Sequence, residues 1–111
     1  MAVYVPRKGD FVALSFDPQS GHEQRGRRPA LVVSNDLFNR STGLAFVCPL
    51  THTDRKLPFH VAVPTGLPVD GFVMVEQVKS VDYRSRHATK LGAAPGALLD
   101  EVLAILDACL Y

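Results

Sequence analysis

The chain has 111 residues, of which 47% are hydrophobic and 21% charged, and its formal net charge is +1 at pH 7. This length suits a single domain over residues 1–111 with one hydrophobic core, and the composition argues against a disordered chain. No apolar run approaches the roughly 18 residues that a membrane-spanning helix needs, and the N-terminus lacks a basic-then-apolar signal pattern, so we expect a cytoplasmic protein without a membrane partner.

The first part of the chain is predicted to form short strands joined by polar turns. Val12, Leu14 and Phe16 alternate with their neighbours in the pattern of a half-buried strand. Polar segments rich in turn-forming residues separate the strands, and residues 35–43 are expected to be one such connection. Short strands at these spacings favour a compact barrel or sandwich. Further strands are predicted at residues 30–34, 44–50 and 59–63, with a longer one at 72–81.

The last segment has a helical period instead. Leu98, Val102 and Ile105 recur at three- and four-residue steps, which predicts an amphipathic helix with Pro95 near its first turn. We therefore predict a mainly β fold, a small antiparallel β-barrel closed by one C-terminal α-helix. A helix this apolar could also serve a dimer interface. Its outer face is expected to carry Asp100, Glu101 and Asp107.

Charge is distributed unevenly along the chain. All twelve Lys and Arg residues lie at or before Lys90, and only acidic charged residues follow it. A basic body of this kind suggests a surface that binds a polyanion. The two cysteines, Cys48 and Cys109, are predicted to be buried thiols rather than a disulfide. The cysteines and the four histidines show no metal-ligand spacing, so we expect neither a metal nor another cofactor.

Two polar loops concentrate reactive side chains. Residues 21–29 place Glu23 among three arginines, whose planar guanidinium groups suit phosphate recognition. Residues 49–58 include Thr51, which would place a hydroxyl at the rim of the barrel where a buried strand ends. Simpler interpretations exist for both loops: a solvated turn with a surface Glu–Arg pair, and a strand-end threonine bonded to its own backbone.

These segments also carry a resemblance to the MazF/PemK toxin family. The family signature is a Gly-Asp strand start, a Gly-x-Glu-Gln-x-Gly-x-Arg-Pro loop and a following apolar strand, matched here by residues 9–10, 21–29 and 30–34. Every fixed position of the loop signature is present in order. The resemblance covers nearly the whole chain, continuing through residues 35–40, 47–51, 57–58 and 76–82 and the apolar C-terminal helix.

The resemblance implies an SH3-like barrel and a homodimeric toxin that cuts single-stranded mRNA at short sequences without a metal ion. By position, Arg28 matches the family's catalytic arginine, Thr51 its catalytic threonine and Glu23 its loop glutamate. It also implies a cognate MazE-like antitoxin with an acidic tail that occupies the RNA groove. The matched segments and the two polar loops give these candidate RNA-binding residues: Gln24, Arg25, Arg27, Asn39, Arg55, Lys56, Glu76, Gln77, Lys79 and Ser80.

The expected chemistry is attack of the RNA's own 2′-hydroxyl on the adjacent phosphate, which leaves 2′,3′-cyclic phosphate and 5′-hydroxyl ends. Arg28 would stabilise charge at the phosphorane, and Thr51 would orient the phosphate or the 2′-hydroxyl. His22 and His52 lie beside the matched positions and are better suited to proton transfer. The family pattern requires neither histidine.

Two other functions fit the same fold. A non-enzymatic toxin resembling CcdB would poison DNA gyrase through a protein contact, but such toxins lack the loop at residues 23–29 together with Thr51. An RNA-binding barrel that has lost catalysis is a further alternative, against which the intact Arg28 and Thr51 argue.

Overall fold

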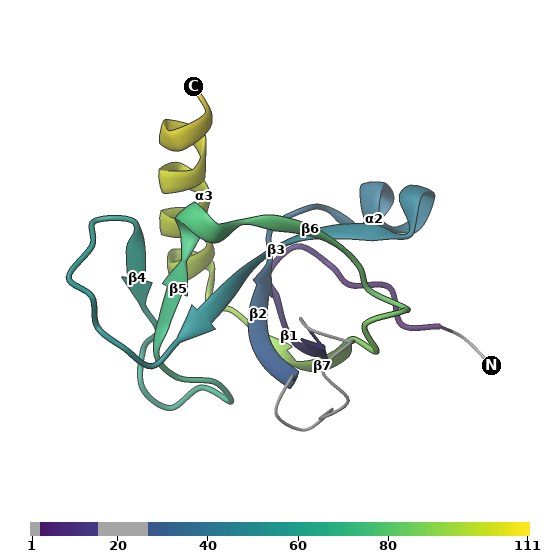
Figure 1. Ribbon diagram of the computed structural model, residues 1–111, viewed down its shortest axis with the longest axis horizontal. Coiled ribbons are helices and arrows are strands. Elements are labelled where there is room, and N and C mark those ends of the chain that lie inside the picture. The colour runs from purple at the N-terminus through teal and green to yellow at the C-terminus, as the bar shows by residue number, and fades with distance from the viewer. Residues whose placement is uncertain (1–2, 16–26) are drawn as a thin grey trace.

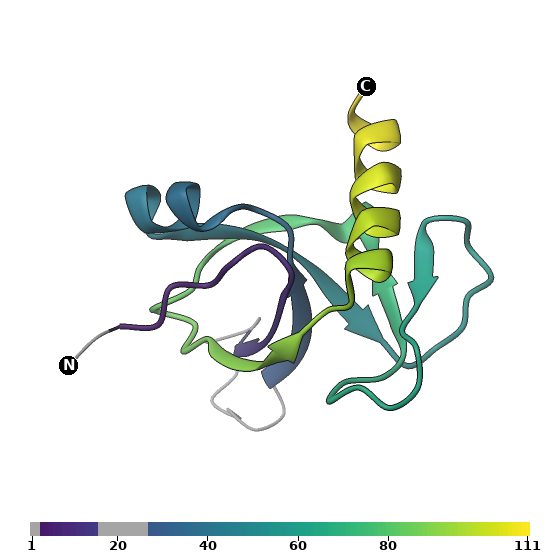
Figure 2. The ribbon, with the colours of Figure 1, turned by 180° about the vertical axis from the view of Figure 1, so that it is seen from behind.

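The computed structural model describes residues 3–15 and 27–111. Its strands form one curved antiparallel sheet with β4 and β7 at the two edges, and helix α3 stands against one face (Figure 1, Figure 2). The prediction of a mainly β fold with a C-terminal helix is confirmed, although the sheet stays open and is not a closed barrel. The elements are β1 (Asp10–Ser15), β2 (Arg27–Val32), α2 (Asp36–Thr42), β3 (Leu44–Thr51), β4 (His60–Ala62), β5 (Phe72–Met74), η1 (Val75–Gln77), β6 (Lys79–Asp82), β7 (Thr89–Ala93) and α3 (Gly96–Leu110).

Strand β3 is the centre of the sheet. One of its edges pairs with β2, and its other edge pairs first with β6 and then, near Thr51, with β5. The single strand predicted at 72–81 is therefore wrong, because the one-turn 3-10 helix η1 divides it into β5 and β6. At this turn the Val75 N–H donates to the Phe59 carbonyl, and the Val78 N–H donates to Val75, so the backbone leaves the ladder with β3.

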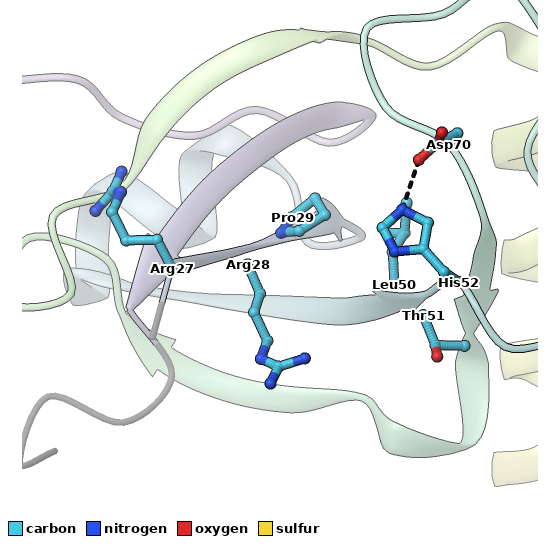
Figure 3. Close-up of a pocket in the computed structure, with 7 residues that line it drawn as sticks. All are labelled: Arg27, Arg28, Pro29, Leu50, Thr51, His52 and Asp70. Atoms are coloured by element: carbon cyan, nitrogen blue, oxygen red, sulfur yellow. Dashed lines mark hydrogen bonds and ion pairs between the residues drawn. The ribbon is translucent and has the colours of Figure 1, made fainter. Parts of the chain in front are cut away.

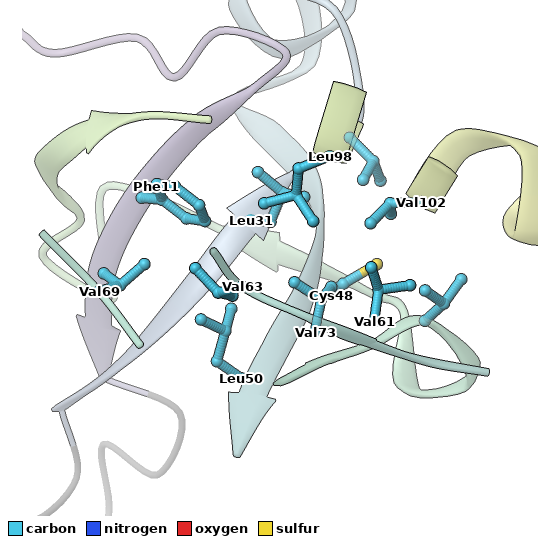
Figure 4. Close-up of a cluster of buried hydrophobic side chains, with 12 residues drawn as sticks. Phe11, Leu31, Cys48, Leu50, Val61, Val63, Val69, Val73, Leu98 and Val102 are labelled. Atoms are coloured by element: carbon cyan, nitrogen blue, oxygen red, sulfur yellow. The ribbon is translucent and has the colours of Figure 1, made fainter. Parts of the chain in front are cut away.

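Hydrophobic side chains pack on both faces of the sheet, where the sequence predicted a single core. One cluster lies between the sheet and α3 and includes Phe11, Leu31 and Cys48 from the strands and Val102 from the helix (Figure 4). The second lies on the opposite face, where Val12, Leu14, Ala30, Val32 and Val47 are covered by partly buried N-terminal residues. Alternate residues of β1 and of the second half of β2 pack into different clusters, so β1 is buried almost throughout and β2 is buried from Ala30 to Val32. The prediction that β1 is half-buried is therefore wrong.

Helix α3 has the expected amphipathic character. Pro95 precedes its first turn, and the three acidic residues of the predicted outer face are exposed.

Both cysteines are free, but only Cys48 is buried. Cys109 is exposed near the helix end, which corrects the prediction of two buried thiols. Burial raises the pKa of the Cys48 thiol to about 12, with a further contribution from the charge of Glu76. In the described ranges, no helix is both long and apolar enough to cross a membrane.

Besides η1, two elements were absent from the prediction. Residues 35–43 hold helix α2, whose first turn is capped by the Asn35 side chain accepting the Phe38 N–H, and which ends at Gly43 in the left-handed conformation. These are ordinary capping signals, so the helix could have been read from the sequence. Strand β7 pairs with β1 across an irregularity in register and is too mixed in polarity to show the alternation of a strand.

Candidate active site

Arg28 and Thr51 come together where the ladder between β2 and β3 ends. The last backbone pair joins Ala30 to Pro49, and continuing that register by two residues places Arg28 opposite Thr51. Opposed residues of an antiparallel pair point to the same face. Pro29 and Pro49 have no N–H to donate, which weakens the ladder at this end. Arg28 is instead held by β1, where it pairs with Leu14, so it lies in a strand and not in the predicted loop.

A cavity of about 290 Å³ opens at this point. Arg28 and Thr51 extend to the same side of their strands, whereas Arg27 extends the other way (Figure 3). The structure therefore brings the two predicted catalytic residues of the described part into one site. The His52 imidazole and the Asp70 carboxylate line the same cavity from the other side (Figure 3). The lining residues are Arg27, Arg28, Pro29, Leu50, Thr51, His52 and Asp70.

The side chains of Arg28 and Thr51 can both still bind a ligand. The Thr51 hydroxyl accepts a hydrogen bond from the Thr53 N–H at 3.2 Å, so the threonine does bond to nearby backbone at the strand end. The proton of the hydroxyl can still be donated to a ligand. No carboxylate within residues 3–15 and 27–111 pairs with the exposed Arg28 guanidinium. A phosphate group could therefore accept hydrogen bonds from both side chains.

His52 and Asp70 form a further part of this site. The Nε2 atom of His52 lies 2.7 Å from Oδ1 of Asp70, and both side chains are exposed (Figure 3). His52 was considered from the sequence because it follows Thr51. Asp70 was missed, because it is 18 residues further along the chain and no local motif links the two. Across the described ranges, no group of three or more His, Cys, Asp or Glu side chains forms a metal-binding arrangement.

The predicted RNA-binding residues differ in their surroundings. Arg27 donates to the Ala13 carbonyl and the Thr89 hydroxyl, and so ties β2 to neighbouring strands. The Glu76 carboxylate lies 2.9 Å from Nε2 of His60, which is buried beneath it. The remaining predicted residues are exposed but do not line the cavity. They are Gln77, Lys79 and Ser80 on η1 and β6, and Arg55 and Lys56 between β3 and β4. Glu23, Gln24, Arg25 and His22 lie outside the described residues, and their roles stay predictions.

Asn39 contradicts its prediction as an RNA-binding residue. Its side chain is fully buried, donates to the carbonyls of Pro6 and Ser34, and accepts the Ser34 hydroxyl. The Tyr83 hydroxyl donates to the Asn39 backbone carbonyl. All these bonds lie within the fold, so Asn39 joins α2 to the N-terminal segment and has no surface to offer a ligand.

Asn39→Ala should therefore act on stability and not on RNA binding. The buried Pro6 carbonyl and the part-buried Ser34 carbonyl and hydroxyl would lose partners, which should lower the free energy of unfolding by about 2–4 kcal/mol. Urea unfolding measures this, with Arg40→Ala, an exposed neighbour on α2, as the control that should change little. A fully stable Asn39→Ala protein with weakened RNA binding would restore the original prediction.

Comparison with known proteins gives a consistent picture. Residues 7–110 match the family described as the PemK-like, MazF-like toxin of type II toxin–antitoxin systems. The "Endoribonuclease toxin MazF" of Escherichia coli K12 is 43% identical over 89 residues, which cover 80% of this chain and 79% of the relative. A crystal structure of MazF from Deinococcus radiodurans is 46% identical, with a TM-score of 0.87 over 97% of this chain and 98% of that one. A MazE-MazF crystal structure from the same organism is 44% identical, with a TM-score of 0.88 over 96% and 97% of the chains.

Proposed function

We propose that the cavity between Arg28 and Thr51 is where RNA is cut, because the chain belongs to the PemK-like, MazF-like toxin family of type II toxin–antitoxin systems. Relatives that are 31–43% identical are named endoribonucleases, and this chain is an endoribonuclease toxin. The observation that carries the location of the site is that Arg28 and Thr51 line one cavity on one face of the sheet. We further propose that residues 1–111 act as one toxin domain in the cytoplasm.

The proposed reaction needs no external nucleophile. The 2′ oxygen of the RNA forms a bond to the adjacent phosphorus while the bond from phosphorus to the 5′ oxygen breaks. Arg28 stabilises the extra negative charge on the phosphorane oxygens through charge-assisted hydrogen bonds. The Thr51 hydroxyl donates to a phosphate oxygen and holds the two reacting oxygens in line. None of these steps involves a metal ion.

The proposed partners follow from charge and from the relatives. The substrate is single-stranded RNA, bound by a homodimer whose basic surface includes Arg28 and exposed cations such as Arg55. An acidic segment of a MazE-like antitoxin would compete for this surface. Support comes from solved MazE-MazF complexes of the similar Deinococcus radiodurans protein and from the position of all twelve Lys and Arg residues at or before Lys90.

Incubation of the purified protein with a long unstructured RNA in EDTA tests the function. We expect discrete cuts whose 5′ ends are labelled by polynucleotide kinase without prior phosphatase treatment, since the ends carry a free hydroxyl. A gyrase supercoiling assay with the same preparation should show no inhibition. Intact RNA together with inhibited gyrase would overturn the proposal in favour of the gyrase poison.

A further inference from the structure

The site contains a proton-accepting group that Arg28 and Thr51 do not supply. Attack by a 2′-hydroxyl requires a group that removes its proton, whereas arginine side chains stay protonated and a threonine hydroxyl is a poor base. His52 lines the same cavity as Arg28 and Thr51, directly after Thr51 in the chain. An imidazole with a free lone pair is a side chain suited to this role.

We propose that His52 is the general base of RNA cleavage and that Asp70 is its positioning residue. This inference rests on the proposed function. The Asp70 carboxylate can only accept a hydrogen bond, so the 2.7 Å contact places the imidazole proton on Nε2 and leaves the lone pair on Nδ1. Nδ1 lies on the side of the ring turned away from Asp70 (Figure 3).

The proton balance of the step is simple. Nδ1 of His52 takes the proton of the 2′-hydroxyl as the 2′ oxygen bonds to phosphorus. The bond to the 5′ oxygen breaks, and that oxygen leaves with the electron pair and takes a proton from water. Asp70 stabilises the imidazolium until His52 returns its proton to solvent. Among the described residues, the other charged groups that line the cavity are the Arg27 and Arg28 guanidinium groups, and Arg28 balances the charge of the phosphorane.

The backbone around Asp70 supports a fixed arrangement. Gly71 follows Asp70 with a φ of 105°, and a Cβ atom there would overlap the Thr51 carbonyl oxygen and lie 3.1 Å from the Thr51 carbonyl carbon. The segment carrying Asp70 is thus seated directly on the backbone of Thr51 and His52. This close approach brings the backbone of Asp70 beside that of His52, and their two side chains meet at 2.7 Å.

The test compares His52→Gln and Asp70→Asn with two matched controls, His87→Gln and Asp100→Asn, which change exposed residues outside the cavity. Cleavage of a short RNA with one cut site is followed against pH. Binding is measured separately with the same RNA carrying a 2′-deoxynucleotide at the cut site, which cannot react. Circular dichroism and thermal unfolding establish that each variant is folded.

We expect His52→Gln to lower kcat by about 10²-fold or more and to remove the rise of the wild-type rate with pH, while binding of the deoxy RNA is unchanged. Asp70→Asn should lower kcat less and alter the pH profile, which a purely structural role would not do. Wild-type pH profiles and rates in both folded variants would overturn the roles of His52 and Asp70 and leave the proposed function standing. Loss of deoxy-RNA binding in parallel with cleavage would also overturn them. A wild type that cuts no RNA would overturn both proposals.

Discussion

Replacing Arg28 by alanine should lower the rate of RNA cleavage by about 10³-fold, since preorganised positive charge at a phosphorane contributes on this scale. The side chain is exposed at the edge of the cavity, and Leu14 and the backbone of β1 hold its strand in place. Truncation should therefore leave the fold and its stability nearly unchanged. Single-turnover cleavage of a short RNA measures the effect without contributions from product release.

Two further variants serve as controls for Arg28→Ala. Arg28→Lys keeps the charge but loses the planar fork, so it should recover only part of the rate. Arg84→Ala removes an exposed arginine outside the cavity and should cut RNA as the wild type does. If Arg28→Ala and Arg84→Ala had the same small effect, Arg28 would contribute only to the general attraction of RNA, and the active site would have to lie elsewhere.

Gly71→Ala should both destabilise the protein and slow cleavage. The residue has a φ of 105°, which side chains rarely adopt, and an added Cβ would overlap the Thr51 carbonyl. Strain of this kind together with a backbone clash should cost about 2–5 kcal/mol in the free energy of unfolding. Relief of the clash must displace Thr51 or Asp70, so the folded fraction should also cut RNA more slowly.

Gly66→Ala is the matched control for this prediction. Gly66 lies in the same connection between β4 and β5 with a φ of 90°, but an added Cβ meets no atom within 4 Å. It should show the conformational strain alone, about 1–2 kcal/mol, and leave cleavage by the folded protein unchanged. Equal effects of the two substitutions on stability and on rate would contradict the close approach between Gly71 and Thr51.

The periodic parts of the fold could be predicted from the sequence. The alternation in β1 and the three- and four-residue steps of α3 predicted both elements, although β1 is buried on both faces and not on one. The break at η1 could not be expected, because Val75 remains apolar and buried while the backbone leaves the ladder. Helix α2 had readable capping residues in Asn35 and Gly43, but it is short and its apolar residues show no clear stripe.

The site was predictable only as far as a sequence motif extended. Arg28 and Thr51 were predicted as catalytic because their positions match the family signature. The register between β2 and β3 explains why their side chains lie on the same face of the sheet. Asp70 depends on a long connection folding back onto Thr51, which no local pattern encodes. Asn39 was misassigned because a polar residue in a matched segment looks the same in sequence whether it binds a ligand or a buried carbonyl.

The most direct test of the account uses one RNA in two forms, with purified wild-type protein in EDTA. The first form is all-ribose, and the second has a single 2′-deoxynucleotide on the 5′ side of the cut. We predict that the first is cut to 2′,3′-cyclic phosphate and 5′-hydroxyl ends, and that the second binds equally well but is not cut there. Cleavage of the deoxy RNA at the same position would contradict attack by the 2′-hydroxyl and the roles proposed for the groups around Arg28 and Thr51.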